Sequence, residues 1–155
     1  MNSKSINIIF VSIDLLLVHG TERKMNNTIP SGTIGVGVDI ESLERFKCLS
    51  REKDISYLAK IFTETELDYC FSKEEAYPHL AARFVGKEAV IKALYSIGIR
   101  DLIYSDIEIT NDNYGVPMVR YICNTMRNIT TKISLSHSAE NAIAFVIIRE
   151  DDTDE

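Results

Sequence analysis

The longest patterned segment of the chain, residues 79–98, is apolar on almost every side and has the length of a helix. It nevertheless carries Arg83, Lys87, Glu88 and Lys92. A surface helix normally keeps its charges on one face. On a helix that is apolar nearly all round, a charge is costly unless it is paired, bound to a metal or engaged with a ligand. The pattern therefore predicts a helix that carries a functional site.

Five other segments have the alternating or branched apolar pattern of strands. They are residues 33–40, 106–110, 116–122, 132–136 and 142–149. In the first, four branched apolar residues point one way, and Gly35, Gly37 and Asp39 point the other. The second and third strands flank a polar turn, and the last two form a closing pair.

Shorter helices are predicted between the first strand and the central helix. Residues 41–60 fit one or two helices, and Thr63 with Glu66 forms a capping box that opens a helix over residues 63–72. Residues 123–130 are ambiguous and compatible with a short helix. Helices gather in the first half and strands in the second. This order predicts an α+β fold, with an antiparallel sheet packed against a long central helix and shorter helices.

Three parts of the chain differ in composition. Residues 1–32 end in a Pro-Ser-Gly linker, and we expect them to be an extension outside the domain, either a targeting segment or a mis-assigned start. Residues 33–149 form the compact domain, and residues 150–155 an acidic, disordered tail. The apolar run over residues 6–18 is shorter than the roughly 18 residues of a membrane span, so no stable membrane insertion is expected.

Composition narrows the class of protein. The 155 residues suffice for one domain with a real core, and the net charge of −6 provides no overall basic field for nucleic acid. Cys48, Cys70 and Cys123 are far apart and match no zinc or disulfide pattern. Free thiols favour a reducing compartment, and we expect a cytoplasmic location.

The charges of the central helix fall on two sides. With about 3.6 residues per turn, Glu88 and Lys92 share one side, and Arg83 and Lys87 another. An exposed salt bridge would explain Glu88 and Lys92 without any function, but their neighbours are apolar. If Asp39 lies beside Glu88, the two carboxylates and substrate phosphate oxygens would hold Mg²⁺. Lys92 would then reach a phosphate as a point charge.

Three further motifs are weak when taken singly. The Gly-rich first strand lacks the third glycine of a dinucleotide fingerprint, because that position is Ile40. Its glycines allow close approach of another backbone, with Asp39 as a cap of the next helix. His137, at a strand end, could donate to a phosphate or to a backbone carbonyl. Gly115 and Pro117 mark a turn.

Taken in order, these motifs resemble the holo-acyl-carrier-protein synthase family of phosphopantetheinyl transferases. The resemblance rests on residues 35–40 followed by Arg45, on residues 62–66, on residues 81–93 and on residues 134–138, and it covers about residues 33–149. One departure is Val116, where the family often has lysine. This weakens any side-chain contact with phosphate at that position.

The resemblance implies a 4′-phosphopantetheinyl transferase fold and a Mg²⁺-dependent reaction. The 4′-phosphopantetheine moiety of coenzyme A passes to a serine of apo-acyl-carrier protein, which yields holo-acyl-carrier protein and adenosine 3′,5′-bisphosphate. Asp39 and Glu88 would hold Mg²⁺, and Lys92 would stabilise developing charge. The base would be Glu88 or a metal-bound water.

The resemblance also implies the remaining binding residues and the partners. The nucleotide contacts would be Arg83, Lys87, His137, Gly115 and Pro117. Arg45 and Arg51, in a local positive patch, would dock the acidic carrier protein, by default that of fatty-acid (lipid) biosynthesis.

Assembly and alternatives complete the hypothesis. Members of the family are homotrimers with active sites shared between subunits, which would account for the apolar helix and strand faces. Two alternatives stay open. One is a catalytically idle module that binds coenzyme A or a carrier protein, and the other is a Mg²⁺-dependent phosphoesterase. The presence of Asp39, Glu88 and Lys92 argues against the idle module. The lack of further clustered acids or histidines argues against the phosphoesterase.

Overall fold

The computed structural model describes residues 30–100, 102–122, 126 and 128–151. Its elements in chain order are β1 (Ile34–Ser42), η1 (Leu43–Phe46), α1 (Arg51–Leu58), α2 (Glu64–Phe71), α3 (Ala76–Ser96), η2 (Tyr104–Asp106), β2 (Ile107–Asn111), β3 (Pro117–Tyr121), β4 (Ile129–His137) and β5 (Asn141–Glu150). Each predicted strand is present. Residues 1–29 of the predicted extension, and residues 123–125 and 127 of the ambiguous segment 123–130, lie outside the described residues.

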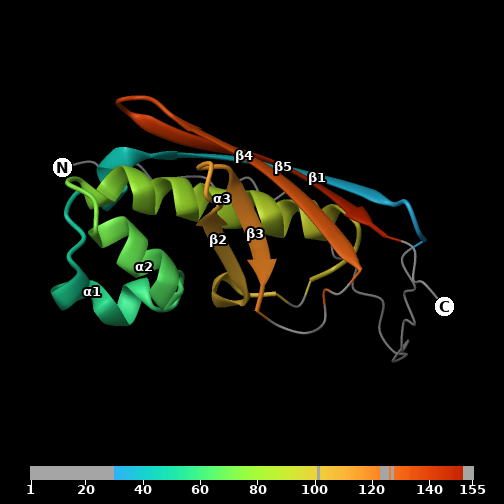
Figure 1. Cartoon of the computed structure of the whole chain (residues 1–155), viewed down its shortest axis with the longest axis horizontal. Helices are drawn as coiled ribbons and strands as arrows, with labels where there is room; N and C mark the ends of the chain where they lie inside the picture. The colour runs from blue at the N-terminus through green and yellow to red at the C-terminus, as the bar shows by residue number, and fades with distance from the viewer. Residues whose placement is uncertain (1–29, 101, 123–125, 127, 152–155) are drawn as a thin grey trace, which may run out of the picture.

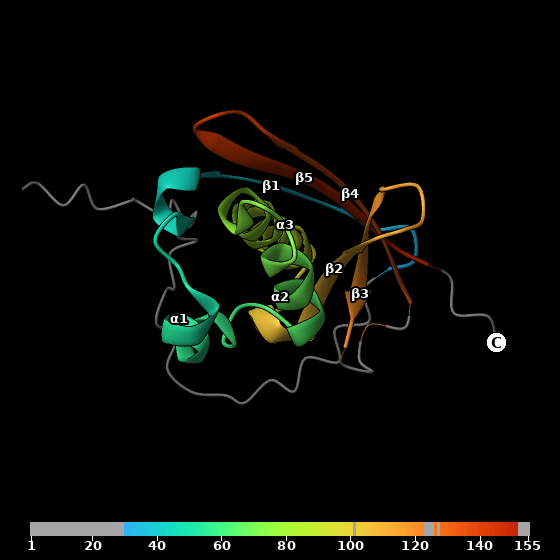
Figure 2. The same ribbon diagram turned by 60° about the vertical axis from the view of Figure 1, so that its left-hand side comes forward.

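The architecture is α+β, as the sequence predicts. An antiparallel sheet of order β1-β5-β4 forms one layer along α3, and α1 and α2 lie on the other side of this helix (Figures 1 and 2). The hairpin β2–β3 forms a second, two-stranded sheet that contacts α2, α3 and β4. The core therefore surrounds α3, in which thirteen consecutive or near-consecutive residues from Leu80 to Leu94 are buried.

The capping box predicted for α2 is confirmed. The Thr63 hydroxyl accepts from the Glu66 backbone N–H, and the Glu66 carboxylate accepts from the Thr63 N–H at 2.8 Å. Glu66 is only 1% exposed, so its charge is buried as well as used for capping. Glu66 thus has a second role besides capping: its buried carboxylate pairs with the ammonium of Lys87.

The glycines of β1 allow the closest approach of α3 to the sheet. A Cβ on Gly37 would lie 1.9 Å from the carbonyl oxygen of Ala89, and a Cβ on Gly35 would lie 2.4 Å from that of Ala93. The alternative that these glycines serve packing against another backbone is therefore confirmed. Gly35 lies against Ala93 and Gly37 against Ala89, so β1 and α3 run in opposite directions. Asp39, two residues after Gly37, therefore lies beside the turn of α3 that precedes Ala89.

We expect Gly37→Ala to destabilise the fold by about 1–3 kcal/mol, because the added methyl group meets backbone atoms that cannot rotate away. Urea denaturation measures the change. Ser134→Ala, at an exposed position of β4, is the control and should have little effect. Equal stability of the two variants would contradict the close packing of β1 on α3.

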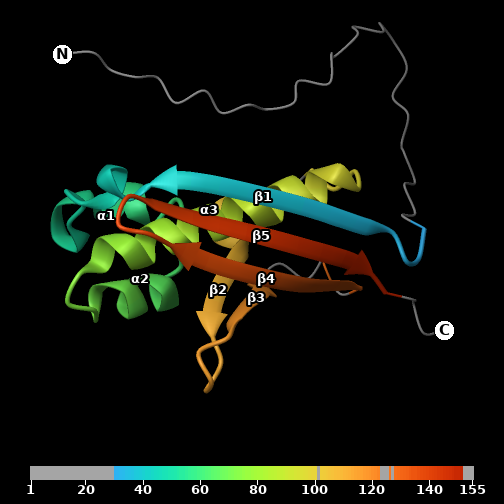
Figure 3. The ribbon, with the colours of Figure 1, turned by 90° about the horizontal axis from the view of Figure 1, so that it is seen from above.

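The outer face of the three-stranded sheet is apolar and uncovered by any described element (Figure 3). Seven side chains on it are between 41% and 62% exposed: Ile34, Val36, Val38, Ile40, Ile143, Phe145 and Ile147. The same face of β4 is polar. The apolar area is thus confined to β1 and β5, and exposed apolar patches of this kind mark interaction sites.

The C-terminal end of the domain lies later than predicted. Glu150 is the last residue of β5, and the backbone N–H of Asp151 donates to Asn128, so the expected disordered tail does not begin at residue 150. Residues 152–155 lie outside the described part. Within the described part of the chain, no helix has both the length and the apolar character needed to cross a bilayer.

Candidate active site

Asp39 and Lys92 meet between β1 and α3. The Lys92 ammonium donates to Asp39 Oδ1 at 2.8 Å and lies 3.3 Å from the carbonyl oxygen of Val38. Burial raises the pKa of the Asp39 carboxyl above its ordinary value, while the bond from Lys92 acts in the opposite direction. The alternative of a functionless Glu88–Lys92 salt bridge is therefore not what the structure has: Lys92 pairs with Asp39 and joins the helix to the first strand.

Glu88 accepts a hydrogen bond from the hydroxyl of Tyr104 on its Oε1 atom. The whole residue is 9% exposed, and its Oε2 atom has no hydrogen bond or ion pair within the described residues. Glu88 Oε2 is not fully enclosed, so a cation or donor from outside the described residues can reach it. This supports a functional role for Glu88 and argues against a solvated surface charge.

Asp39 and Glu88 belong to one neighbourhood. Gly37 packs on Ala89, so Asp39, two residues further along the same face of β1, lies beside the turn of α3 that carries Glu88. The pKa of the Tyr104 phenol is raised by its burial and by Glu88, and in smaller measure by Asp39. The predicted proximity of the two carboxylates is thus consistent with the geometry.

The two carboxylates fit a Mg²⁺ ion that is shared with a substrate. Within the described residues, no group of three or more His, Cys, Asp or Glu side chains could hold a metal ion alone. Mg²⁺ is commonly held by one or two carboxylates together with phosphate oxygens and water. The donor set of Asp39 and Glu88 matches that arrangement.

Lys87 lies in the interior and not at a ligand site. Its ammonium is fully buried, pairs with Glu66 Oε2 at 2.7 Å and donates to the backbone carbonyls of Ile61, Tyr104 and Ile107 at 2.6–2.9 Å. Burial lowers the pKa of Lys87, and the charge of Glu66 opposes this shift. The expectation that Lys87 contacts a nucleotide does not fit this position, because no part of the side chain is accessible.

Arg83 joins α3 to the β2–β3 hairpin. Its guanidinium donates to the Asn111 side-chain oxygen and lies 4.7 Å from the centre of the Tyr69 ring, and the Asn111 amide donates to the Gly115 carbonyl at 2.8 Å. Arg83 is 4% exposed, yet its Nε atom has no hydrogen-bond partner among the residues that the structure describes. Gly115 has φ of +84°, which a turn residue without a side chain adopts readily, and Pro117 begins β3.

His137, at the end of β4, is exposed and lies near a second histidine. The pKa of His79 is lowered first by burial and then by nearby positive charges, those of Lys73, Arg83 and His137. The structure thus brings Arg83 and His137 near the cation Lys73 and near His79, whose lowered pKa favours the neutral imidazole; the sequence analysis selected neither Lys73 nor His79. A cluster of positive groups around a buried guanidinium suits a phosphate.

Asp39 and His137 lie at opposite edges of the three-stranded sheet, whereas Arg83 and Glu88 both lie on α3. Glu41 of β1 and His137 of β4 both pair with Ala142 of β5. With neighbouring strands ~4.8 Å apart, the edges at Asp39 and His137 are separated by about 10 Å. Among the described residues, no hydrogen bond or ion pair joins Asp39 or Glu88 to Arg83 or His137 within one protomer.

The two arginines expected to dock a carrier differ in their surroundings. Arg45 pairs with Glu41 at 2.6 Å and stacks over the Phe84 ring at 4.7 Å, close to Tyr104. Arg51 is bound by two acids, Glu64 and Asp68. Arg45 adjoins the carboxylate site directly, whereas the charge of Arg51 is balanced locally.

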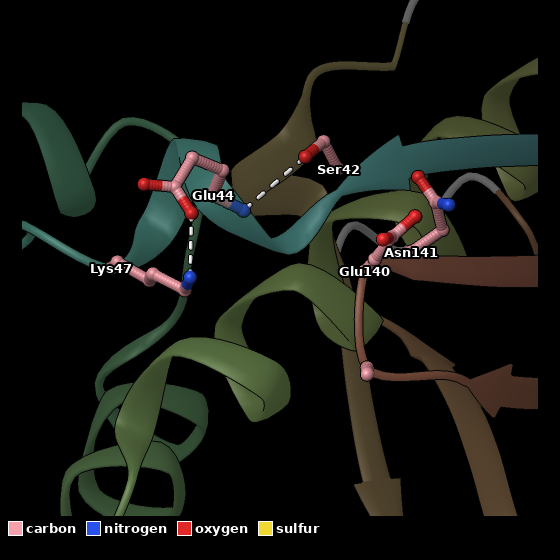
Figure 4. A pocket seen from close by; sticks show the side chains of 6 residues that line it. Ser42, Glu44, Lys47, Glu140 and Asn141 are labelled. Atoms are coloured by element: carbon pink, nitrogen blue, oxygen red, sulfur yellow. Dashed lines mark hydrogen bonds and ion pairs between the residues drawn. The ribbon is translucent and has the colours of Figure 1, made fainter.

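A shallow hollow of about 210 Å³ lies at the end of β1, next to the β4–β5 turn (Figure 4). It is lined by Ser42, Glu44, Lys47, Ala139, Glu140 and Asn141. Lys47 is bound to Glu44 at 2.6 Å, and the remaining charge is acidic. The hollow therefore offers no converging positive groups for a nucleotide and is distinct from the Asp39–Glu88 site.

Tyr104 is the site residue that the sequence analysis missed. It follows Glu88 by sixteen positions, in a short 3-10 turn with no periodic pattern. Only the return of this loop onto α3 brings its hydroxyl to the carboxylate, so no sequence spacing could have revealed it.

Comparison with known proteins identifies the family. Residues 35–146 match the family model of the 4′-phosphopantetheinyl transferase superfamily. A holo-[acyl-carrier-protein] synthase of Thermodesulfovibrio yellowstonii is 45% identical over 114 residues, which cover 74% of this chain and 96% of the relative.

Solved structures agree with the sequence match. A holo-(acyl-carrier-protein) synthase of Bacillus anthracis in complex with CoA (3′,5′-ADP) has a TM-score of 0.61 at 28% identity, covering 76% of this chain and 96% of that one. That of Helicobacter pylori, in complex with coenzyme A, has a TM-score of 0.62 at 32% identity, covering 73% and 98%. The chain belongs to the 4′-phosphopantetheinyl transferase superfamily.

Proposed function

We propose that this chain is a holo-acyl-carrier-protein synthase, which transfers 4′-phosphopantetheine from coenzyme A to a serine of an apo-acyl-carrier protein. The observation that carries the proposal is the Asp39–Lys92 ion pair at the β1–α3 junction, with Glu88 on the same stretch of α3, in a chain that aligns with such synthases over most of their length. The relatives from Bacillus anthracis and Helicobacter pylori bind coenzyme A or its nucleotide portion, which supports the donor.

Asp39 and Glu88 would hold Mg²⁺ in this reaction. The bound ion would neutralise the pyrophosphate of coenzyme A and polarise the phosphorus that is attacked. Lys92, which donates a hydrogen bond to Asp39 in this structure, would turn its ammonium to the phosphate and stabilise negative charge on the leaving oxygen. Transfer of this kind depends chiefly on positioning and charge neutralisation.

The bonds that change are few. The oxygen of the carrier serine forms a bond to the β-phosphorus, and the bond from that phosphorus to adenosine 3′,5′-bisphosphate breaks. The serine proton passes to a base, which is either Glu88 or a water molecule held in the site. Arg83 and His137, together with His79, would hold nucleotide phosphates, and Gly115 and Pro117 would lie near the adenine.

The partners follow from the charges around the site. The carrier of fatty-acid biosynthesis is an acidic protein, and Arg45 is the best placed docking residue, because it is partly exposed and adjoins Tyr104. Charge complementarity of this kind directs encounter and register. Free Cys48 and Cys70 support a cytoplasmic location.

We further propose a homotrimer in which neighbouring subunits complete each site. Two observations support it: the apolar outer face of β1 and β5, and the positions of Asp39 and His137 at opposite edges of the sheet within one protomer. Burial of seven exposed apolar side chains between copies would provide the driving force. A nucleotide bound across the seam could then touch both groups.

We expect Val38→Glu to break the trimer, because it places a charge in the middle of the apolar face. Light scattering after size exclusion should show a mass of three 17.5 kDa chains for the wild type and a smaller mass for the variant. Ser56→Glu, at an exposed position of α1, is the control and should leave the mass unchanged. A monomeric wild type would contradict the proposal.

One assay separates the proposed function from its alternatives. The protein is mixed with coenzyme A, Mg²⁺ and apo-acyl-carrier protein, and the carrier mass is measured. A gain of one phosphopantetheine group supports the transferase. Coenzyme A binding without any gain would favour the idle module, and release of free phosphopantetheine would favour the phosphoesterase.

A further inference from the structure

We propose that Tyr104 is a positioning residue for Glu88: its hydroxyl holds Oε1 of the carboxylate so that Oε2 stays available to a divalent cation. The inference rests on the proposed function, because the orientation of Glu88 matters only if its carboxylate takes part in a metal-dependent transfer. The sequence pattern gives no indication that Tyr104 belongs to the site. We infer its positioning role from three contacts that it makes with α3.

Tyr104 is anchored at three points by one stretch of α3. Its ring stacks on that of Phe84 with centroids 5.8 Å apart and planes at 22°. Its backbone carbonyl accepts from the buried ammonium of Lys87 at 2.9 Å. Its hydroxyl donates to Glu88. Ring, backbone and hydroxyl are thus all tied to successive turns of the helix that carries the carboxylate.

This anchoring makes the hydroxyl a fixed donor. A glutamate side chain has three rotatable bonds, and ordering it on binding a ligand costs free energy. Glu88 has no other hydrogen bond or ion pair in the described part of the chain, so the Tyr104 hydroxyl is the contact that selects its orientation. Partners of this type commonly change metal affinity by 10- to 100-fold when removed.

Tyr104→Phe is the sharp variant. It keeps the ring on Phe84 and the backbone bond from Lys87, and it removes only the oxygen that meets Glu88. Tyr121→Phe is the matched control. It also removes a partly buried tyrosine hydroxyl, which makes the 2.7 Å contact with Thr131, but from strand β3.

The direct readout is Mn²⁺ binding in the presence of saturating coenzyme A and without carrier protein, so that no turnover occurs. The free Mn²⁺ signal is followed by electron paramagnetic resonance. We expect Tyr104→Phe to weaken Mn²⁺ binding by about 10-fold or more and Tyr121→Phe to change it less than about 2-fold. In the transfer assay, Tyr104→Phe should need a correspondingly higher Mg²⁺ concentration and regain most of the wild-type rate at saturating Mg²⁺.

A double-mutant cycle tests whether Tyr104 acts through Glu88. In the Glu88→Gln background, Tyr104→Phe should weaken Mn²⁺ binding no further. Urea denaturation of all variants, run in parallel, measures any loss of stability separately.

The outcomes are distinguishable. Wild-type Mn²⁺ affinity in Tyr104→Phe, or a stability loss with unchanged affinity, overturns the positioning role and leaves the transferase intact. An equal loss of affinity in the Glu88→Gln background shows that Tyr104 acts by another route and also overturns it. A wild type that binds Mn²⁺ but transfers nothing overturns the proposed function, and with it this inference.

Discussion

Replacing Asp39 with Asn, or Glu88 with Gln, is expected to reduce kcat by at least about 100-fold, since loss of even an outer-shell partner of a metal costs 10- to 100-fold. Each change keeps the shape of the side chain and removes the negative charge that Mg²⁺ requires. The measurement is the rate at which the carrier gains the mass of phosphopantetheine, at saturating coenzyme A and Mg²⁺. The fold should persist, because the Asp39–Lys92 pair is partly exposed and contributes little to stability.

The control for this pair is Glu140→Gln. Glu140 is an exposed acid at the β4–β5 turn whose carboxylate makes no hydrogen bond or ion pair among the described residues. It should retain the wild-type rate. Near-normal turnover of either Asp39→Asn or Glu88→Gln, with circular dichroism unchanged, would remove the metal assignment for that residue.

The second large effect concerns stability. Lys87→Met should lower the free energy of unfolding by about 3–5 kcal/mol, because it leaves the Glu66 carboxylate buried without its partner. It also deprives the carbonyls of Ile61, Tyr104 and Ile107 of a donor. Urea denaturation, monitored by circular dichroism, measures the loss.

Two comparisons make this prediction specific. Lys47→Met removes the exposed ion pair with Glu44 and should have little effect. The double variant Lys87→Met with Glu66→Gln should be more stable than Lys87→Met alone, since the amide can accept from the Ile109 N–H without a buried charge. If the double variant is no more stable than the single one, the buried pair is not the cause of the loss.

Local signals of the fold were readable in the sequence. The capping box at Thr63 and Glu66, the alternation of β1 and the length of α3 depend on neighbours three or four positions away, or on every second residue. The α+β class followed from the order of these elements. The glycines of β1 also indicated a close approach, although which backbone approached was not decided by the pattern.

The direction of the sheet faces and the partners of the charges were not readable. Alternation in β1 shows that Val36 and Val38 share a face, but it cannot say that this face is uncovered. Helical spacing paired Glu88 with Lys92, whereas Lys92 binds Asp39, 53 positions away, and Glu88 binds Tyr104. Contacts between residues so far apart in the sequence depend on how β1 and η2 pack against α3.

The sequence alone indicated the family and the element order and predicted Asp39, Glu88 and Lys92 as site residues, because motif spacing is a linear pattern. Only the tertiary structure decided what each charge of α3 does. It buried Lys87 against Glu66 and three carbonyls, tied Arg83 to the β2–β3 hairpin through Asn111, and brought Tyr104 onto Glu88. The physical reason is that a buried charge must be met by whatever donors and acceptors the packing supplies, and those come from distant segments.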